Sequence, residues 1–147
     1  MEEKRIASFY GHDHDELDAH FHDYRNLKRE DYKKAKESFM KFESDLQRHI
    51  IWEEDILFPL FEEKTGMHNS GPTFVMREEH RQIKDYLKQI YAKVEQNDPE
   101  TDTEEESLLE LLKSHNQKEE SVLYPAIDQV TSEEDKETVF QKMKVDK

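Results

Sequence analysis

The sequence has no cysteine in its 147 residues. Disulfides, thiolate nucleophiles and iron–sulfur clusters are therefore excluded, and any metal ion must be bound by histidine and carboxylate side chains. Only three glycines and four prolines punctuate the chain. No apolar run approaches the roughly 18 to 20 residues that cross a bilayer, and the N-terminus, Met1 to Arg5, lacks the apolar segment of a secretory signal. These absences predict a cytoplasmic protein without a membrane partner.

Positive charge is also scarce, with 22 Lys and Arg against 36 Asp and Glu and a formal charge of -14. Such a chain repels polyphosphate, so we do not expect a nucleic-acid partner. A charged content of 39% approaches that of disordered chains. The length suits a single domain spanning 1–147, and the pattern of apolar residues has to decide whether it folds.

That pattern is helical. Apolar residues recur every three or four positions in four long segments, which predicts helices over about 9–28 and 32–63, from Pro72 along Met76 to Val94, and along Leu108 to Ala126. Asp31 is a candidate N-cap, Thr65-Gly66 a stop, and Ser132 or Thr131 the start of a short last helix over about 132–144. We therefore predict an all-α fold: an up-down antiparallel four-helix bundle, its core over about 9–130, with a short C-terminal helix. Pro59 and Pro125 should kink or tighten the second and fourth helices.

The apolar seams of these helices contain six polar residues. A buried imidazole or carboxylate is costly unless it is compensated, so six coincident cases need a common cause. The positions are His14, His49, Glu53, His80, His115 and Glu119.

An internal repeat relates these positions. His14 and His80 are 66 residues apart, as are His49 and His115. At the same offset, residues 49–59 align without gaps on residues 115–125 and share the pattern His-x-x-x-Glu-Glu-x-x-Leu-aromatic-Pro. The chain therefore looks like a duplicated helical hairpin.

The repeat also predicts that the six residues meet. Residues of antiparallel neighbours lie at one height when the turn falls at their midpoint, and the midpoints of the successive histidine pairs fall at the predicted turns. His and Glu at i and i+4 share a helix face, so one helix offers both a nitrogen and a bridging oxygen. Four His and two Glu with this symmetry suit two metal ions, and imidazole with carboxylate suits iron, manganese or zinc.

With Asp13-His14, His49-x-x-x-Glu53, Glu79-His80 and His115-x-x-x-Glu119, the sequence resembles the hemerythrin-like (HHE cation-binding) domains over about residues 9–130. The resemblance implies a four-helix bundle around a non-haem di-iron centre. Its metal ligands would fall on His14, His49, Glu53, His80, His115 and Glu119. Two positions differ from the oxygen carriers of the family: Lys84 replaces a second histidine of the third helix, and Glu119 replaces a more distant aspartate.

Other polar residues have two readings. Glu54 and Glu120 are either surface residues or groups that orient the ligands. Asp18 follows His14 by one turn and either orients a ligand or supplies a spare oxygen, or has a solvated or capping role. His12 is a surface residue or a substitute for His14. Lys84 is either a surface lysine or a cation beside the metals. We assign Tyr124 to core packing.

Our leading hypothesis is a di-iron protein that binds O2 or a related small oxidant, peroxide or nitric oxide, as store, sensor or detoxifier. The alternatives are a di-iron oxidoreductase with peroxidase or ferroxidase activity, and a metal-free acidic helical adaptor. Manganese or zinc are less favoured occupants than iron.

Overall fold

In a computed structural model, residues 5–145 are described, and every regular element among them is helical. The first two long helices are α1 (Ile6–Leu27) and α2 (Tyr32–Trp52), and the latter continues without a break through η1 (Glu53–Leu57) into α3 (Phe58–Thr65). The third is α4 (Gly71–Glu95). The fourth comprises α5 (Asp102–Lys118), η2 (Glu119–Leu123) and α6 (Tyr124–Val130), and α7 (Glu133–Val145) follows.

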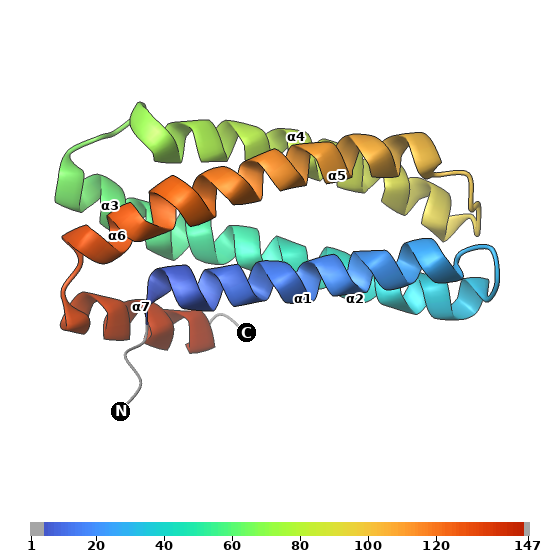
Figure 1. Ribbon diagram of the computed structural model, residues 1–147, viewed down its shortest axis with the longest axis horizontal. Coiled ribbons are helices and arrows are strands. Elements are labelled where there is room, and N and C mark those ends of the chain that lie inside the picture. Colours follow the sequence, from blue (N-terminus) through green and yellow to red (C-terminus); the bar gives the residue numbers. More distant parts are fainter. Residues whose placement is uncertain (1–4, 146–147) are drawn as a thin grey trace.

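These helices form the predicted bundle. Helix α1 packs mainly on α2, and α4 mainly on α5, with neighbours antiparallel (Figure 1). The short helix α7 runs alongside the end of the bundle where α1 begins (Figure 1). The sequence-based fold class, including the short C-terminal helix, is confirmed.

The hydrophobic core consists of two clusters separated along the bundle axis. One surrounds Tyr10, Trp52 and Tyr124 and is covered by α7. The other contains Leu17, Phe42, Val94 and Leu112 and fills the half that ends in the α1–α2 and α4–α5 turns. Because His14 lies between Tyr10 and Leu17 on α1, the six polar residues of the helix seams fall between these clusters. We call these six residues the polar layer.

Most helix ends follow the predicted chemistry. Asp31 accepts a hydrogen bond from the Lys34 backbone N–H, and Gly66 ends α3 with a φ of 76°. Ser132 and Asp135 cap each other's backbone N–H groups at distances of 3.0 and 2.9 Å, as a capping box does. The last helix therefore begins at the predicted place.

The predicted start of the first helix at residue 9 is wrong by three residues. The side chain of Asp128 accepts hydrogen bonds from the backbone N–H groups of Ile6 (2.9 Å) and Ala7 (3.0 Å). This cap comes from α6, more than 120 residues away, so it extends α1 without a local signal.

The helices carrying Pro59 and Pro125 widen into π turns, where we expected tightening or a kink. In η1 the Phe58 N–H bonds to the Glu53 carbonyl, and in η2 the Tyr124 N–H bonds to the Glu119 carbonyl. Each π turn ends two residues before a proline, whose ring would otherwise crowd the preceding turn. π turns of this kind are common at functional sites.

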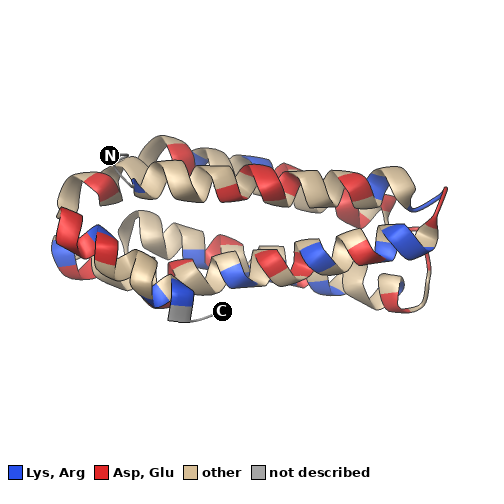
Figure 2. Ribbon diagram, turned by 90° about the horizontal axis from the view of Figure 1, so that it is seen from below, with Lys and Arg blue, Asp and Glu red and all other residues tan. Residues whose placement is uncertain are grey.

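Lys and Arg are interspersed with Asp and Glu along the helices (Figure 2). Among residues 5–145, none of the helices combines the length and apolar character needed to cross a membrane.

Candidate metal centre

The structure brings all six predicted site residues into one layer at the middle of the bundle. Each side chain is at most 4% exposed, and the two glutamates are fully buried. The six come from all four long helices: His14 from α1, His49 and Glu53 from α2 and η1, His80 from α4, and His115 and Glu119 from α5 and η2. The predicted layer is therefore observed.

The two glutamates lie among the four imidazoles. Oε1 of Glu119 is 3.2 Å from Nε2 of His14 and 3.3 Å from Nε2 of His115. Oε1 of Glu53 is 3.1 Å from Nε2 of His80 and 3.6 Å from Nε2 of His49. Each glutamate thus contacts histidines from two different helices, as a carboxylate shared between two metal-binding groups would do.

The outer nitrogen of every imidazole meets its own carboxylate. Each carboxylate belongs to a residue adjacent in sequence to one of the six, and each reaches a histidine of the next helix, so that the four contacts form a closed ring. The pairs are Asp13 with His49 (2.7 Å), Glu54 with His80 (2.6 Å), Glu79 with His115 (2.9 Å) and Glu120 with His14 (3.0 Å). We call these four residues the outer carboxylates.

The outer carboxylates decide which way the histidines point. A carboxylate only accepts, so Nδ1–H of each ring donates to it. In a neutral imidazole Nε2 then carries a free lone pair. In this structure all four Nε2 atoms face Glu53 or Glu119, which we call the inner glutamates. Carboxylate–imidazole pairs of this kind orient metal-binding histidines.

Sequence reasoning found these outer carboxylates only in part. It left Glu54 and Glu120 open between surface and orienting positions, and the structure places both against imidazoles. It gave no role to Asp13 or Glu79. The signal was available, because Asp13 and Glu79 are themselves 66 residues apart.

Tyr124 is the second departure from the sequence analysis, which assigned it to core packing. Its hydroxyl oxygen is 2.7 Å from Oε2 of Glu53 and 2.9 Å from Oε1 of Glu119. Residues five apart in an α-helix point about 140° away from each other. The π turn η2 brings Tyr124 back beneath Glu119, so the tyrosine joins the polar layer.

Negative charge governs the protonation of the layer when no metal is present. Burial alone would lower the pKa values of His14 and His80. Contacts with Glu119 raise that of His14, and contacts with Glu53 raise that of His80, in each case to about 9. Burial and the charge of Glu119 raise the pKa of Glu53. Burial would raise the pKa of Glu119 as well, but a hydrogen bond from Glu53 and the charge of His115 lower it well below its usual value. Without metal, His14 and His80 therefore hold their protons at neutral pH.

The donor set fits metal ions. One donor atom each from Glu53, His80, His115 and Glu119 lie within 4.8 Å of one another, and His14, His49 and Glu119 form a second such group. Oε2 of Glu119 is buried without a hydrogen-bond partner. Because a buried, unpaired carboxylate oxygen is unfavourable, a cation at this position would supply the missing interaction. The layer is thus able to hold metal.

The remaining candidates lie outside the layer. His12 is exposed and pairs with Glu16, so it does not replace His14. Asp18 and Lys84 are also exposed. The inward reading of Lys84 is therefore wrong, and the third helix contributes a single imidazole.

A small cavity touches the layer on the side away from α7. It has a volume of about 10 Å³, and apolar side chains such as Phe42 and Ile83 line it together with the histidines. About this much space is needed to hold one water molecule. The cavity is therefore sized for a very small ligand.

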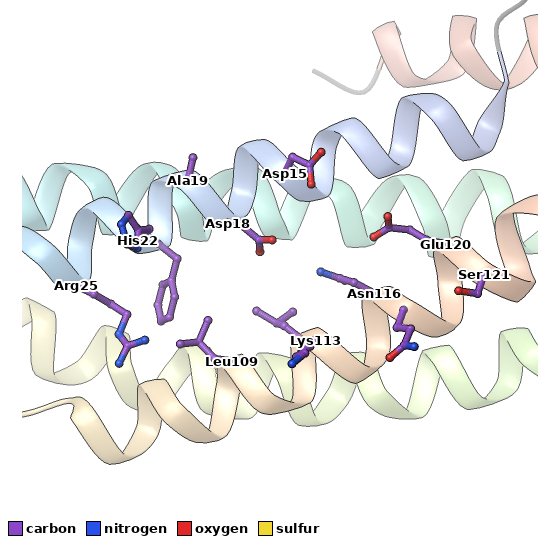
Figure 3. A pocket seen from close by; sticks show the side chains of 13 residues that line it. Asp15, Asp18, Ala19, His22, Arg25, Leu109, Lys113, Asn116, Glu120 and Ser121 are labelled. Carbon is purple, nitrogen blue, oxygen red and sulfur yellow. The ribbon is translucent and has the colours of Figure 1, made fainter.

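A larger groove of about 980 Å³ runs along the outside, between α1 and α5 (Figure 3). Asp18, Leu112 and Asn116 line both the groove and the small cavity. Asp18 projects from α1 into the space between the two helices (Figure 3). These three side chains are the wall between solvent and the layer.

Comparison with known proteins agrees with this site. The family model of the hemerythrin HHE cation-binding domain matches residues 5–127. An uncharacterized hemerythrin-like protein of Schizosaccharomyces pombe is 29% identical over 132 residues, which are 89% of this chain and 63% of that protein. The chain thus spans less than two thirds of that relative's length. No solved structure gives a significant match. From the family match and the histidine–glutamate layer at its centre, we conclude that the chain belongs to the hemerythrin HHE cation-binding domain family.

Proposed function

We propose that this protein holds two iron ions on His14, His49, Glu53, His80, His115 and Glu119 and uses them to bind O2 or a related small oxidant as store, sensor or detoxifier. One observation carries the proposal: four imidazoles from four helices, each oriented by its own outer carboxylate, face two shared inner carboxylates. A core that served only for packing would not retain ten ionisable groups in such an arrangement.

The protein's own groups have distinct tasks. The histidines provide neutral nitrogen donors, and Glu53 and Glu119 provide negative charge between the two halves of the site. The outer carboxylates hold the imidazole tautomer and orientation. When bound, two redox-active metal ions would supply the electrons that a small oxidant accepts.

The surroundings support a ligand no larger than a few atoms. Apolar side chains line the cavity beside the layer, and its volume of about 10 Å³ excludes larger substrates. The side chains of Asp18, Leu112 and Asn116 line both this cavity and the α1–α5 groove. We expect the oxidant to approach through this wall.

Metal stoichiometry tests the proposal. The protein, stripped with a chelator and loaded anaerobically with ferrous iron, should bind two equivalents. The double variant His49→Ala/His115→Ala should lose stoichiometric binding, while His12→Ala/His68→Ala, at two exposed histidines, should keep it. Two ions retained by the first variant would overturn the ligand assignment.

Oxygen exposure then tests the function. Admitting oxygen to the ferrous protein and purging with argon should produce a visible spectrum that appears and disappears reversibly. Retention of the ferrous spectrum in oxygen would contradict oxygen binding.

A second candidate is an oxidoreductase that turns over peroxide or oxidises ferrous iron. Lys84 is exposed, so position 84 adds no donor to the six ligand residues. The two metals would then keep positions without a protein donor, which favours an enzyme. Steady-state consumption of peroxide that is lost in Glu53→Ala would support it, and a single turnover would contradict it. A metal-free adaptor, in contrast, would have the same thermal stability before and after chelation.

A further inference from the structure

Tyr124 and Phe58 occupy equivalent positions, 66 residues apart, in the two halves of the chain. Each follows a π turn and precedes a proline. The Phe58 ring stacks on His80 with 5.7 Å between centroids and 10° between planes. Tyr124 instead places a hydroxyl in the polar layer, so the two halves of the site are chemically different.

The Tyr124 hydroxyl lies beside both histidines of one half of the site, His14 and His49. Its oxygen is 3.3 Å from Nε2 of each. With the glutamate contacts of 2.7 and 2.9 Å, it has four potential donor atoms around it at 2.7 to 3.3 Å. Adjacent donors around one metal ion, each at about 2.1 Å from it, are separated by about 3.0 Å in octahedral and about 3.4 Å in tetrahedral geometry. The phenol oxygen therefore has the spacing of a fellow ligand.

The two metal-binding groups are also unequal without it. Four residues contribute to the group of His80 and His115, whereas three contribute to the group of His14 and His49. The histidines that the Tyr124 hydroxyl contacts, His14 and His49, both belong to the smaller group. Its oxygen would raise that group to four residues.

We propose that Tyr124 is a further metal ligand, whose phenol oxygen coordinates the ion held by His14 and His49. This inference rests on the proposed function, since it requires the layer to bind metal. On coordination the phenol O–H bond breaks and its proton passes to solvent, with no change in the oxidation state of the metal. The pair of ions is then inequivalent, because the half containing Phe58 has no such oxygen.

The test is spectroscopic and does not depend on turnover. Wild-type protein, Tyr124→Phe and the control Tyr10→Phe are stripped of metal and titrated anaerobically with Zn²⁺. Tyr10 is a suitable control because it is equally buried and its ring lies 5.3 Å from that of Tyr124, but its hydroxyl bonds to Met143. Circular dichroism and thermal melts establish that the variants fold.

We expect Zn²⁺ to generate the near-ultraviolet difference spectrum of an ionised tyrosine in wild type and Tyr10→Phe, but not in Tyr124→Phe. The ferric forms of the first two should show a tyrosinate-to-iron absorption band with tyrosine ring modes in resonance Raman, and Tyr124→Phe should lack both. Loss of this donor should weaken binding of one of the two ions by at least about tenfold.

Two outcomes separate the inference from the proposed function. If wild type binds two ions and its spectra equal those of Tyr124→Phe, the tyrosine is a packing or hydrogen-bonding residue, and only this inference is overturned. If wild type binds no metal, both are overturned.

Discussion

The Asp13 carboxylate accepts a hydrogen bond from Nδ1 of His49 over 2.7 Å, joining the first helix to the second across the bundle. Both side chains are nearly buried, at 12% and 2% exposed. Among residues 5–145, the aspartate has its polar contact with the imidazole of His49, so we expect its effect on the layer to pass through that ring. It is therefore a positioning residue, and its importance can be measured separately from that of the ligands.

Replacing Asp13 should weaken metal binding without removing a ligand. In Asp13→Ala, His49 Nδ1 loses its acceptor and the ring can rotate or change tautomer, so we expect metal affinity to fall by about 10- to 100-fold. Competition with a chromophoric chelator measures this. Asp15→Ala, an exposed aspartate on the same helix, should bind as wild type does. Equal affinities for the two variants would contradict the positioning role.

The metal-free protein should lose stability as the pH rises. The pKa values of His14 and His80 are raised to about 9, whereas an unfolded histidine titrates near 6.5. The corresponding stabilisation is complete below about pH 6.5 and is lost as the pH rises through about 9, so Tm should fall by several degrees across this interval. Differential scanning calorimetry of the chelated protein measures the fall.

Bound metal should counteract this loss of stability with rising pH. Metal binding requires neutral imidazoles, so apparent affinity should increase over the same pH interval and binding should release protons. The Tm of the loaded protein should accordingly vary less than that of the chelated protein. A chelated protein with constant Tm from pH 6.5 to 9 would contradict the prediction.

A buried ion pair far from the layer should matter for stability alone. Lys28, at the α1–α2 turn, is 5% exposed and lies 2.5 Å from the fully buried carboxylate of Glu105, with Asp102 also in contact. In Lys28→Met the fully buried Glu105 loses its buried cation and keeps the partly exposed Arg25, 2.9 Å away. We expect a destabilisation of about 3 kcal/mol in urea unfolding. The neighbouring Arg29→Met removes a half-exposed side chain whose ion-pair partners are exposed, and it should have little effect. Metal content should stay at the wild-type value in both.

Access to the layer can be tested at its wall. Asn116 borders both the small cavity and the α1–α5 groove, whereas Gln117 borders the groove alone. Asn116→Phe should slow the reaction of the ferrous protein with oxygen several-fold by filling the wall, with two irons still bound. Stopped-flow mixing would reveal this, and Gln117→Phe should react at the wild-type rate. A rate unchanged in Asn116→Phe would mean that the oxidant enters elsewhere.

The sequence predicted the bundle and the six-residue layer because both depend on periodicity. Helical spacing identified the seams, and the offset of 66 residues placed His14 and His80 in corresponding positions. It failed where distant chain segments decide local structure. The cap that Asp128 supplies to α1 is an example, since nothing near Ile6 announces it.

The role of Tyr124 was missed for a different reason. Helical geometry with 3.6 residues per turn turns position 124 away from Glu119, and only the π turn returns it. A proline six residues after each glutamate was the available signal. The same periodicity that located the layer therefore concealed one of its members.

The ring of outer carboxylates also bears on how the chain folds. Three of its contacts join residues 26 or 36 positions apart, between helices connected by one turn. The fourth, from Glu120 to His14, spans 106 residues. Loop-closure entropy grows with separation, so this contact forms at the greatest conformational expense and joins the two hairpins of the repeat. We therefore expect the α1–α5 seam to be the last junction to form, on the same side as the wall through which we propose that the layer is reached.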